Sequence, residues 1–298
     1  HDLKKSFGDI VAVDGLSLSV EAGEIFGLIG PDGAGKSTTL RLLVGVLDAD
    51  AGTAEIGGLR IDRRPEGARE LLGYMPQQYS LYADLTVAEN IRFFADMHFV
   101  SKADREKRVK RLYEFSRLGP YADRRAGQLS GGMYKKLALS CNLIHTPKIL
   151  LLDEPTTGVD PLSRRELWEI LYALAAEDVA VLVSTPYMDE AERCHRVGLM
   201  SAGRFLVTDE PGAIIDRFDE EVYELETPDQ KAALRVLDKA AGITRSYPVG
   251  GILKVAATAG SGESAVSGPL SAAGVVFRGL GRTRPNFEDI FLARAGAR

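Results

Sequence analysis

A glycine-rich segment at residues 30–38 constrains the fold of this chain more than any other stretch. It reads Gly-Pro-Asp-Gly-Ala-Gly-Lys-Ser-Thr, follows an apolar run at 25–29 and precedes a helix-like stretch at 39–44. A Gly-x-x-x-x-Gly-Lys-Ser pattern between a strand and a helix is typical of a phosphate-binding loop. The sequence therefore predicts an α/β domain organised around this loop. The alternative is an ordinary glycine-rich turn between a strand and a helix.

The residue types in the loop indicate how it would bind phosphate. Gly30, Gly33 and Gly35 allow a tight turn in which successive N–H groups point inward, at the amino end of a helix. Lys36 would then reach the β- and γ-phosphates, and the Ser37 hydroxyl would hold magnesium. We therefore expect a magnesium–nucleotide site here.

Polar side chains follow two further apolar strands. The strand at 149–152 runs into Asp153 and Glu154, which we interpret as a magnesium ligand and a general base rather than as the cap of the next turn. The strand at 71–76 leads to Gln77, whose amide can bind magnesium or the attacking water. Taken without its neighbours, Gln77 is more simply a solvated loop residue.

Two other features suit a nucleotide. Leu-Ser-Gly-Gly-Met at 129–133 opens a helix, so that Ser130, Gly131 and Gly132 form a second phosphate-seeking helix end. Phe7 stands beside Gly8, where its ring can either stack on a base or pack against an edge.

Composition excludes several classes of protein. The net charge of -5 gives no basic face for nucleic acid. Cys141 and Cys194 have no disulfide or metal spacing, which favours a reducing cytosol. We expect His98, His145 and His195 to lie apart and to form no metal cluster. No apolar run approaches the roughly 18 to 20 residues that cross a bilayer, so another chain would have to span the membrane.

The periodicity divides the chain into two domains, 1–218 and 219–298. Short strands are expected at 3–7, 11–13 and 16–20, and helical periodicity takes over at about 78–145, where the mixed-charge run 101–112 predicts a solvated helix face. From residue 219 the order strand, helix, strand, helix, strand, with strands at 222–226, 252–256 and 275–277, predicts a small α+β module without a catalytic constellation. An amphipathic helix is expected at 285–292.

With these motifs in this order, the chain resembles the ATP-binding subunit of ATP-binding-cassette (ABC) transporters over about residues 3–215. The Leu-Ser-Gly-Gly-Met form and the tail at 285–292 are similar to the bacterial drug- and ion-exporter subfamily. The resemblance implies an α/β fold: a P-loop NTPase (RecA-like) core, an antiparallel β subdomain and an inserted α-helical subdomain at about 78–145. The small α+β module would follow.

The resemblance also implies ligands, partners and residue roles. ATP and Mg²⁺ would be bound between two cassettes, at the cytoplasmic face of the inner or plasma membrane, and closure of the pair would drive an integral membrane permease. Asp160 would lie in the loop that crosses the dimer interface. The implied catalytic residues are Glu154, Lys36 and Gln77. Phe7 would stack on adenine. The loop residues implied to bind the same nucleotide are Gly30, Gly33, Gly35, Lys36, Ser37 and Thr38. The residues implied to bind ATP held by the partner cassette are Ser130, Gly131 and Gly132. The implied metal ligands are Ser37, Gln77 and Asp153.

Two positions depart from the family pattern. Pro186 stands where the family usually has a histidine that contacts the γ-phosphate, and proline has neither an imidazole nor an N–H. Losing one such donor costs about 10²–10³ in rate, so we expect tight ATP binding and slow hydrolysis. Asp32 replaces the asparagine that the family usually has in the phosphate loop. It adds negative charge near the phosphates, and the effect of this charge depends on whether the side chain faces solvent. Together with a start that lacks methionine and a linker-like end, both departures are similar to the N-terminal half of fused tandem cassettes.

Three functions compete on these grounds. The first is an ATPase subunit that energises export through a separate permease. The second is a nucleotide-gated module in which ATP binding alone drives dimerisation, which Pro186 favours. The third is a soluble cassette protein of DNA repair or translation. Against the third, roughly fifty residues separate Gln77 from Ser130, with no coiled-coil insertion and no basic stripe.

Overall fold

The computed structural model describes residues 1–63, 65–78 and 81–296. The chain forms two compact units, His1–Pro211 and Gly212–Arg298, which are described separately below. The boundary expected at 218 falls just after the short helix α7 (Pro211–Asp216).

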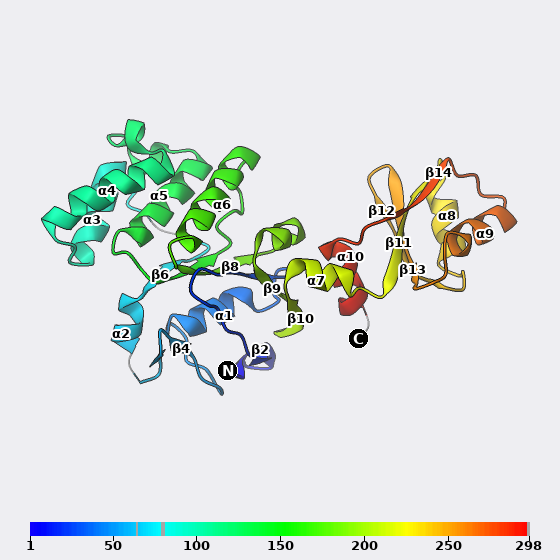
Figure 1. Cartoon of the computed structure of the whole chain (residues 1–298), viewed down its shortest axis with the longest axis horizontal. Helices are drawn as coiled ribbons and strands as arrows, with labels where there is room; N and C mark the ends of the chain where they lie inside the picture. Colours follow the sequence, from blue (N-terminus) through cyan, green and yellow to red (C-terminus); the bar gives the residue numbers. More distant parts are fainter. Residues whose placement is uncertain (64, 79–80, 297–298) are drawn as a thin grey trace. The chain divides into compact units, whose positions relative to one another are not determined.

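The first unit is built on a six-stranded sheet (Figure 1). Four neighbouring strands run parallel to β9, and β10 closes one edge as an antiparallel hairpin partner. The strands read as continuous apolar runs because helices cover both faces of the parallel part. Side by side, they are β10 (Arg204–Asp209), β9 (Arg196–Ser201), β3 (Ile25–Ile29), β8 (Ala180–Thr185), β7 (Ile149–Asp153) and β6 (Leu72–Met75).

Two small antiparallel hairpins belong to the same unit: β1 (Leu3–Phe7) with β2 (Ile10–Leu16), and β4 (Glu55–Ile56) with β5 (Leu59–Arg60). The strand expected at 16–20 is wrong beyond Leu16, which ends β2. Leu18 and Val20 alternate because they pack against the hydrophobic core, but residues 17–20 have no hydrogen-bonded neighbour strand.

Helices fill the region in which helical periodicity was expected. α3 (Val87–Met97) begins at the predicted capping box, in which Glu89 N donates to Thr86 Oγ1 at 3.1 Å and Thr86 N donates to Glu89 Oε2 at 2.8 Å. The mixed-charge run lies in α4 (Lys102–Ser116), which is mostly solvated, as predicted. Residues 79 and 80 of the expected subdomain lie outside the described residues. The other helical elements of this unit are α1 (Lys36–Leu43), α2 (Pro65–Glu70), the 3₁₀ turns η1 (Gly119–Tyr121) and η2 (Ala126–Gln128), α5 (Gly131–Leu143), α6 (Pro161–Ala175) and η3 (Met188–Arg193).

The second unit has the order β-α-β-β-α-β, with antiparallel strands in the order β12-β13-β11-β14. In Figure 1, α8 and α9 lie against one face of this sheet. A final helix contacts β12 and β13 through Asp289. The elements are β11 (Glu220–Glu226), α8 (Gln230–Leu237), β12 (Ile243–Val249), β13 (Ile252–Thr258), α9 (Ser264–Ala272), β14 (Gly279–Thr283) and α10 (Phe287–Ala295).

This unit has one strand more than the sequence predicted. β12 was missed because it is an edge strand of polar, half-exposed residues that includes Pro248. The strand expected at 275–277 is also wrong. Val275 and Phe277 pack against the core from an irregular segment, and the last strand, β14, begins at Gly279. Within the described ranges, no helix has the length and apolarity needed to cross a bilayer.

Candidate functional site

The glycine-rich loop connects β3 to α1, as the sequence predicted. Gly35 is the N-cap of α1 with φ of 102°, and a side chain there would clash with the Ala12 carbonyl oxygen. A side chain at Gly30 would likewise clash with the Met200 carbonyl oxygen. Glycine is therefore required at these two positions because the loop passes directly against neighbouring backbone. The amino end of α1 consequently faces the space enclosed by the loop.

Lys36 is buried inside this loop, with an exposed fraction of 4%. Its Nζ donates to the carbonyl oxygens of Gly30 at 2.7 Å and Pro31 at 3.0 Å, and lies 3.7 Å from Glu154 Oε1. Burial lowers the pKa of Lys36, and the nearby carboxylate of Glu154 opposes this effect. Asp32, whose orientation the sequence left open, is exposed and adds a weaker attraction to the same ammonium group.

Asp153 ends β7 and is fully buried. Its Oδ1 accepts hydrogen bonds from Ser37 Oγ at 2.9 Å and from Ser184 Oγ at 2.7 Å. Its Oδ2 is buried and has no hydrogen-bond partner in the described part of the chain. Burying a carboxylate oxygen without a partner lowers the stability of the folded state. The arrangement therefore suits a cation bound between the Asp153 carboxylate and the Ser37 hydroxyl.

Glu154 is held in one orientation by its neighbours. Its backbone has φ of 50°, an uncommon conformation for a residue with a side chain, and its N–H donates to Ser184 Oγ at 3.0 Å. Its Oε2 accepts from Gln77 Nε2 at 3.0 Å and from Thr157 Oγ1 at 3.1 Å. The structure thus brings Gln77, Glu154 and Lys36 together, although they are far apart in the sequence.

The Ser-Gly-Gly segment opens α5, as expected. Ser130 is the N-cap, and both Ser130 and Gly131 are exposed. A side chain at Gly132 would clash with Ser163 Oγ and would crowd the carboxylate of Asp160, which caps α6. Gly132 is therefore required for the packing of α5 against the start of α6. In the described ranges, no hydrogen bond joins this segment to Lys36 or Asp153.

Phe7 and Thr38 lie at the margins of the site. Phe7 ends β1 with 48% of its surface exposed, and Lys5 Nζ lies 5.7 Å from the ring centroid. The ring is too exposed for simple edge packing, so it remains available for stacking. Thr38 is partly buried in the first turn of α1.

Pro186 follows β8 and is half-buried. The next residue, Tyr187, donates its N–H to Thr185 Oγ1 at 3.1 Å, and the ring of Tyr187 lies 4.7 Å from the guanidinium of Arg164. The segment after β8 is thus fixed by contacts on both sides of the proline.

Sequence reasoning missed three residues that hold this region together. Ser184 bonds both acidic residues, and Thr157 bonds Glu154. Glu190 is fully buried and accepts hydrogen bonds from Thr156 Oγ1, Arg164 Nε and Trp168 Nε1. Of these three, only Ser184 had a signal in the sequence, because its hydroxyl lies near the carboxyl end of a strand. The carboxyl ends of parallel strands meet at one edge of a sheet, where the acids also lie.

The expectation that the histidines lie apart is wrong for two of them. The rings of His98 and His145 stack with centroids 4.0 Å apart, because the ends of α3 and α5 pack together. His145 Nε2 lies 2.9 Å from the Leu72 carbonyl oxygen, and burial lowers the pKa of His145 to about 4. His195 instead accepts from Ile25 N at 2.8 Å. No group of three metal-binding side chains occurs among the described residues.

Comparison with known sequences gives consistent results. A family model described as ABC transporter matches residues 13–157. The probable multidrug ABC transporter ATP-binding protein YbhF of Escherichia coli (strain K12) is 40% identical over 304 residues, which cover 99% of this chain and 51% of that protein. The Nod factor export ATP-binding protein I of Paraburkholderia xenovorans (strain LB400) is 44% identical over 232 residues, covering 77% and 76% of the two chains. The chain thus spans about half the length of YbhF.

Solved structures with the same fold are also ATP-binding cassettes. An ATP-binding subunit of an ABC transporter superimposes with a TM-score of 0.67 and 30% identity, covering 73% of this chain and 91% of the other. The cassette MJ0796, in a dimeric post-hydrolysis state bound to ADP and Pi, superimposes with a TM-score of 0.63 and 26% identity, covering 70% and 96%. These comparisons agree with the predicted P-loop NTPase core.

Proposed function

Because this chain belongs to the family of ABC transporter ATP-binding proteins, we propose that it binds and hydrolyses ATP to energise export through a separate membrane permease. One observation carries the proposal. The loop lysine, the loop serine and the two strand-end acids converge on one site, with Lys36 Nζ 3.7 Å from Glu154 and Ser37 Oγ 2.9 Å from Asp153. This constellation suits phosphoryl transfer.

The loop would hold the phosphates, and three side chains would hold magnesium. Backbone N–H groups at the start of α1 would bind phosphate oxygens, and the Lys36 ammonium would leave the loop carbonyls to reach the β- and γ-phosphates. Ser37, Asp153 and Gln77 supply the oxygen ligands that magnesium prefers, and the unpartnered Asp153 Oδ2 fits this role. When bound, magnesium neutralises charge on the phosphate oxygens.

Glu154 is the proposed general base for the attacking water. Thr157 and Gln77 fix its carboxylate, and this orientation would place one oxygen to accept a proton from water. Gln77 would bind magnesium through its Oε1 atom while its Nε2 donates to Glu154. Gln77 would therefore link the metal site to the base.

We further propose that this site hydrolyses ATP slowly. Pro186 has no imidazole and no N–H to offer the γ-phosphate. A missing donor of this kind costs about 10²–10³ in rate, while ATP binding depends on the intact loop.

A second cassette would complete the site. Ser130 and Gly131 are exposed at the amino end of α5, where they can bind the phosphates of ATP held by another cassette. MJ0796 forms a dimer, and YbhF is about twice the length of this chain. Either a second copy or a second cassette in a longer polypeptide fits this role.

An exposed apolar surface on and beside α3 is the proposed contact with the permease. Phe93 and Tyr82 pack edge to face at 4.6 Å with 38% and 49% of their surfaces exposed, and Met97 and Phe99 are 50% and 94% exposed. Exposed clusters of large apolar side chains mark interaction sites. Such a contact would keep the chain at the cytoplasmic face of the membrane.

The decisive experiment compares wild type with Glu154→Gln, in the transporter assembled with its permease. We expect both proteins to bind a fluorescent ATP analogue equally. Hydrolysis should be low in the wild type and lower in the variant, by about 10²-fold or more. Equal hydrolysis in both, with ATP-dependent dimerisation, would instead support the nucleotide-gated module. Failure of the wild type to bind ATP would contradict both functions.

A further inference from the structure

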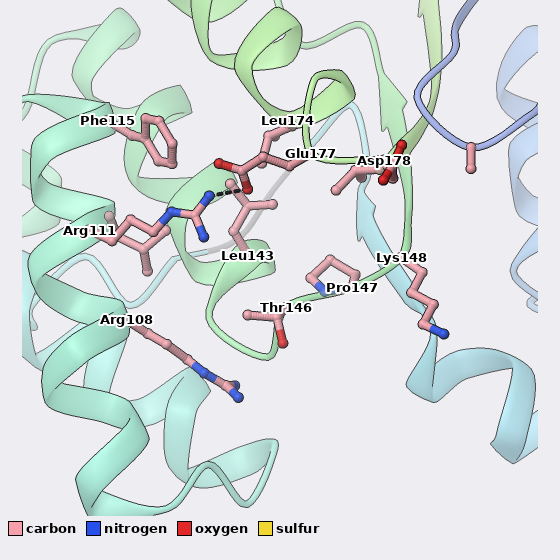
Figure 2. A pocket seen from close by; sticks show the side chains of 13 residues that line it. Arg108, Arg111, Phe115, Leu143, Thr146, Pro147, Lys148, Leu174, Glu177 and Asp178 are labelled. Atoms are coloured by element: carbon pink, nitrogen blue, oxygen red, sulfur yellow. Dashed lines mark hydrogen bonds and ion pairs between the residues drawn. The ribbon is translucent and has the colours of Figure 1, made fainter.

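We propose that the first unit carries a second ligand site, for a dissolved amphiphilic anion: a carboxylate or sulfonate joined to an apolar body. The site is a cavity of about 490 Å³ between α4, the loop after α5 and the end of α6 (Figure 2). It is separate from the residues assigned to ATP, and the inference does not depend on the proposed function.

The cavity has the size and the apolar wall of a small-molecule site. Leu112, Phe115, Leu143 and Leu174 contribute hydrocarbon from three different helices. Ligand pockets of about 300–1,000 Å³ combine such a wall with a few placed polar groups. An apolar body of one or two rings, or a medium-length alkyl chain, therefore fits this space.

Two arginines supply the placed polar groups. Arg108 and Arg111 extend from α4 toward the facing loop and the end of α6, as Figure 2 shows. Arg108 Nη1 donates to the Ile144 carbonyl oxygen at 3.0 Å, a bond that uses one of its five N–H donors. Arg111 pairs with Glu177, and its guanidinium lies 5.0 Å from the Phe115 ring centroid. Two guanidinium groups beside an apolar wall favour an anionic head group.

The same wall argues against a membrane surface as the occupant. Glu177 and Asp178 are exposed and line the cavity beside Arg108, Arg111 and Lys148, so the lining has mixed charge and is not the cluster of cations that binds an anionic bilayer. A single dissolved anion needs no such cluster, because its head group can replace Glu177 as the partner of Arg111. Removing the Glu177 charge should therefore strengthen the binding of such an anion.

The test uses two probes with the same aromatic skeleton. 1-Anilinonaphthalene-8-sulfonate carries the anion, and N-phenyl-1-naphthylamine lacks it. We titrate each probe into the whole 298-residue chain by calorimetry. The sulfonate should bind at one saturable site, about tenfold or more tightly than the neutral probe, because each charge-assisted bond contributes to affinity. Dodecanoate should displace it. Absence of a saturable site, or equal binding of the two probes, would overturn the proposal.

Charge variants locate the site. R108Q/R111Q should weaken sulfonate binding about tenfold, and E177Q should tighten it about threefold. K110Q is the matched control, because it removes a charge from the same helix outside the cavity, and its affinity should stay at the wild-type value. Unchanged binding in R108Q/R111Q, or weaker binding in E177Q, refutes the site. Co-sedimentation with phosphatidylglycerol vesicles that competes with the probe would overturn the choice of a dissolved ligand.

Discussion

Asp153 shows how single residues combine into this site. One carboxylate oxygen is bonded to hydroxyls from α1 and β8, and the other is buried without a partner among the described residues. The hydroxyls fix the orientation of the carboxylate, so the second oxygen can serve a ligand without further rearrangement. Preorganised oxygen donors of this kind bind cations at low entropic cost.

At the residue scale, the first prediction concerns Pro186. Pro186→His should raise the rate of ATP hydrolysis in the assembled transporter, by up to about 10²-fold, because the imidazole adds a donor for the γ-phosphate. Steady-state phosphate release measures the effect. Pro186→Ala is the control, since it removes the ring constraint and restores the backbone N–H without adding an imidazole, so any gain of the histidine variant over the alanine variant reports the imidazole. A histidine variant no faster than the alanine variant would contradict the proposed reason for slow turnover.

At the element scale, the residues of the candidate site lie at the ends of helices and strands. Four elements carry a site residue at one end: Ser130 caps α5, Asp160 caps α6, Asp153 ends β7 and Thr185 ends β8. Their other ends contribute to the cavity proposed for the amphiphilic anion or lie next to its lining residues. Each of these elements therefore connects the two regions. The stacked histidines sit at the ends of two helices in the same way.

The stacked pair predicts a pH-dependent stability. The pKa of His145 is lowered by burial to about 4, and that of His98 is lowered for the same reason, while Arg108 adds positive charge nearby. The unfolded chain, with ordinary histidines, therefore binds more protons than the folded chain between about pH 6.5 and pH 4. This contribution to stability should be fully present above about pH 6.5. Below that value the free energy of unfolding should decrease as the pH is lowered, by about 1–2 kcal/mol after allowance for solvent screening.

Denaturation by urea at about pH 7 and about pH 5 checks this expectation. His145→Gln should reduce the difference between the two conditions, because glutamine can still donate to the Leu72 carbonyl oxygen and does not titrate. His1→Gln is the control, since His1 is exposed. An unchanged pH dependence in the His145 variant would mean that other groups cause it.

For the whole molecule, a buried ion pair joins the final helix of the second unit to its sheet. Asp289 in α10 is 2% exposed and accepts from Lys254 Nζ at 2.8 Å, from Asn286 N at 2.8 Å and from Tyr247 OH. Burial and the Asp289 contact raise the pKa of Tyr247. The network ties the final helix to β12 and β13, so it explains why a charged residue of α10 is buried.

Asp289→Asn should destabilise this unit by about 3–5 kcal/mol, because it leaves the Lys254 ammonium buried without a counter-charge. The double variant Lys254→Met with Asp289→Asn should recover part of the loss, and Glu288→Gln, on the exposed side of the same helix, should have little effect. Hydrogen exchange of amides in β12, β13 and α10 reports the change. A double variant as unstable as Asp289→Asn would rule out the ion pair as the cause.

The parts predicted correctly are those that local chemistry determines. Gly30 and Gly35 are required by backbone contacts inside one loop, and the acids at the end of β7 meet the loop because parallel strands end at one edge. Packing between distant elements was not predictable. The stacking of His98 on His145 depends on how α3 meets α5, and Glu190 finds Trp168 and Arg164 only after α6 packs on the segment that follows β8.

The contacts of Lys36 determine what a substitution at this position would change. Its ammonium group binds two carbonyl oxygens of its own loop and faces Glu154, so it acts as an internal counter-ion as well as a phosphate ligand. Replacing it with methionine would remove both roles at once, leaving two carbonyl dipoles and a carboxylate in mutual repulsion. Weak nucleotide affinity in such a variant would then reflect a deformed loop as much as a missing contact.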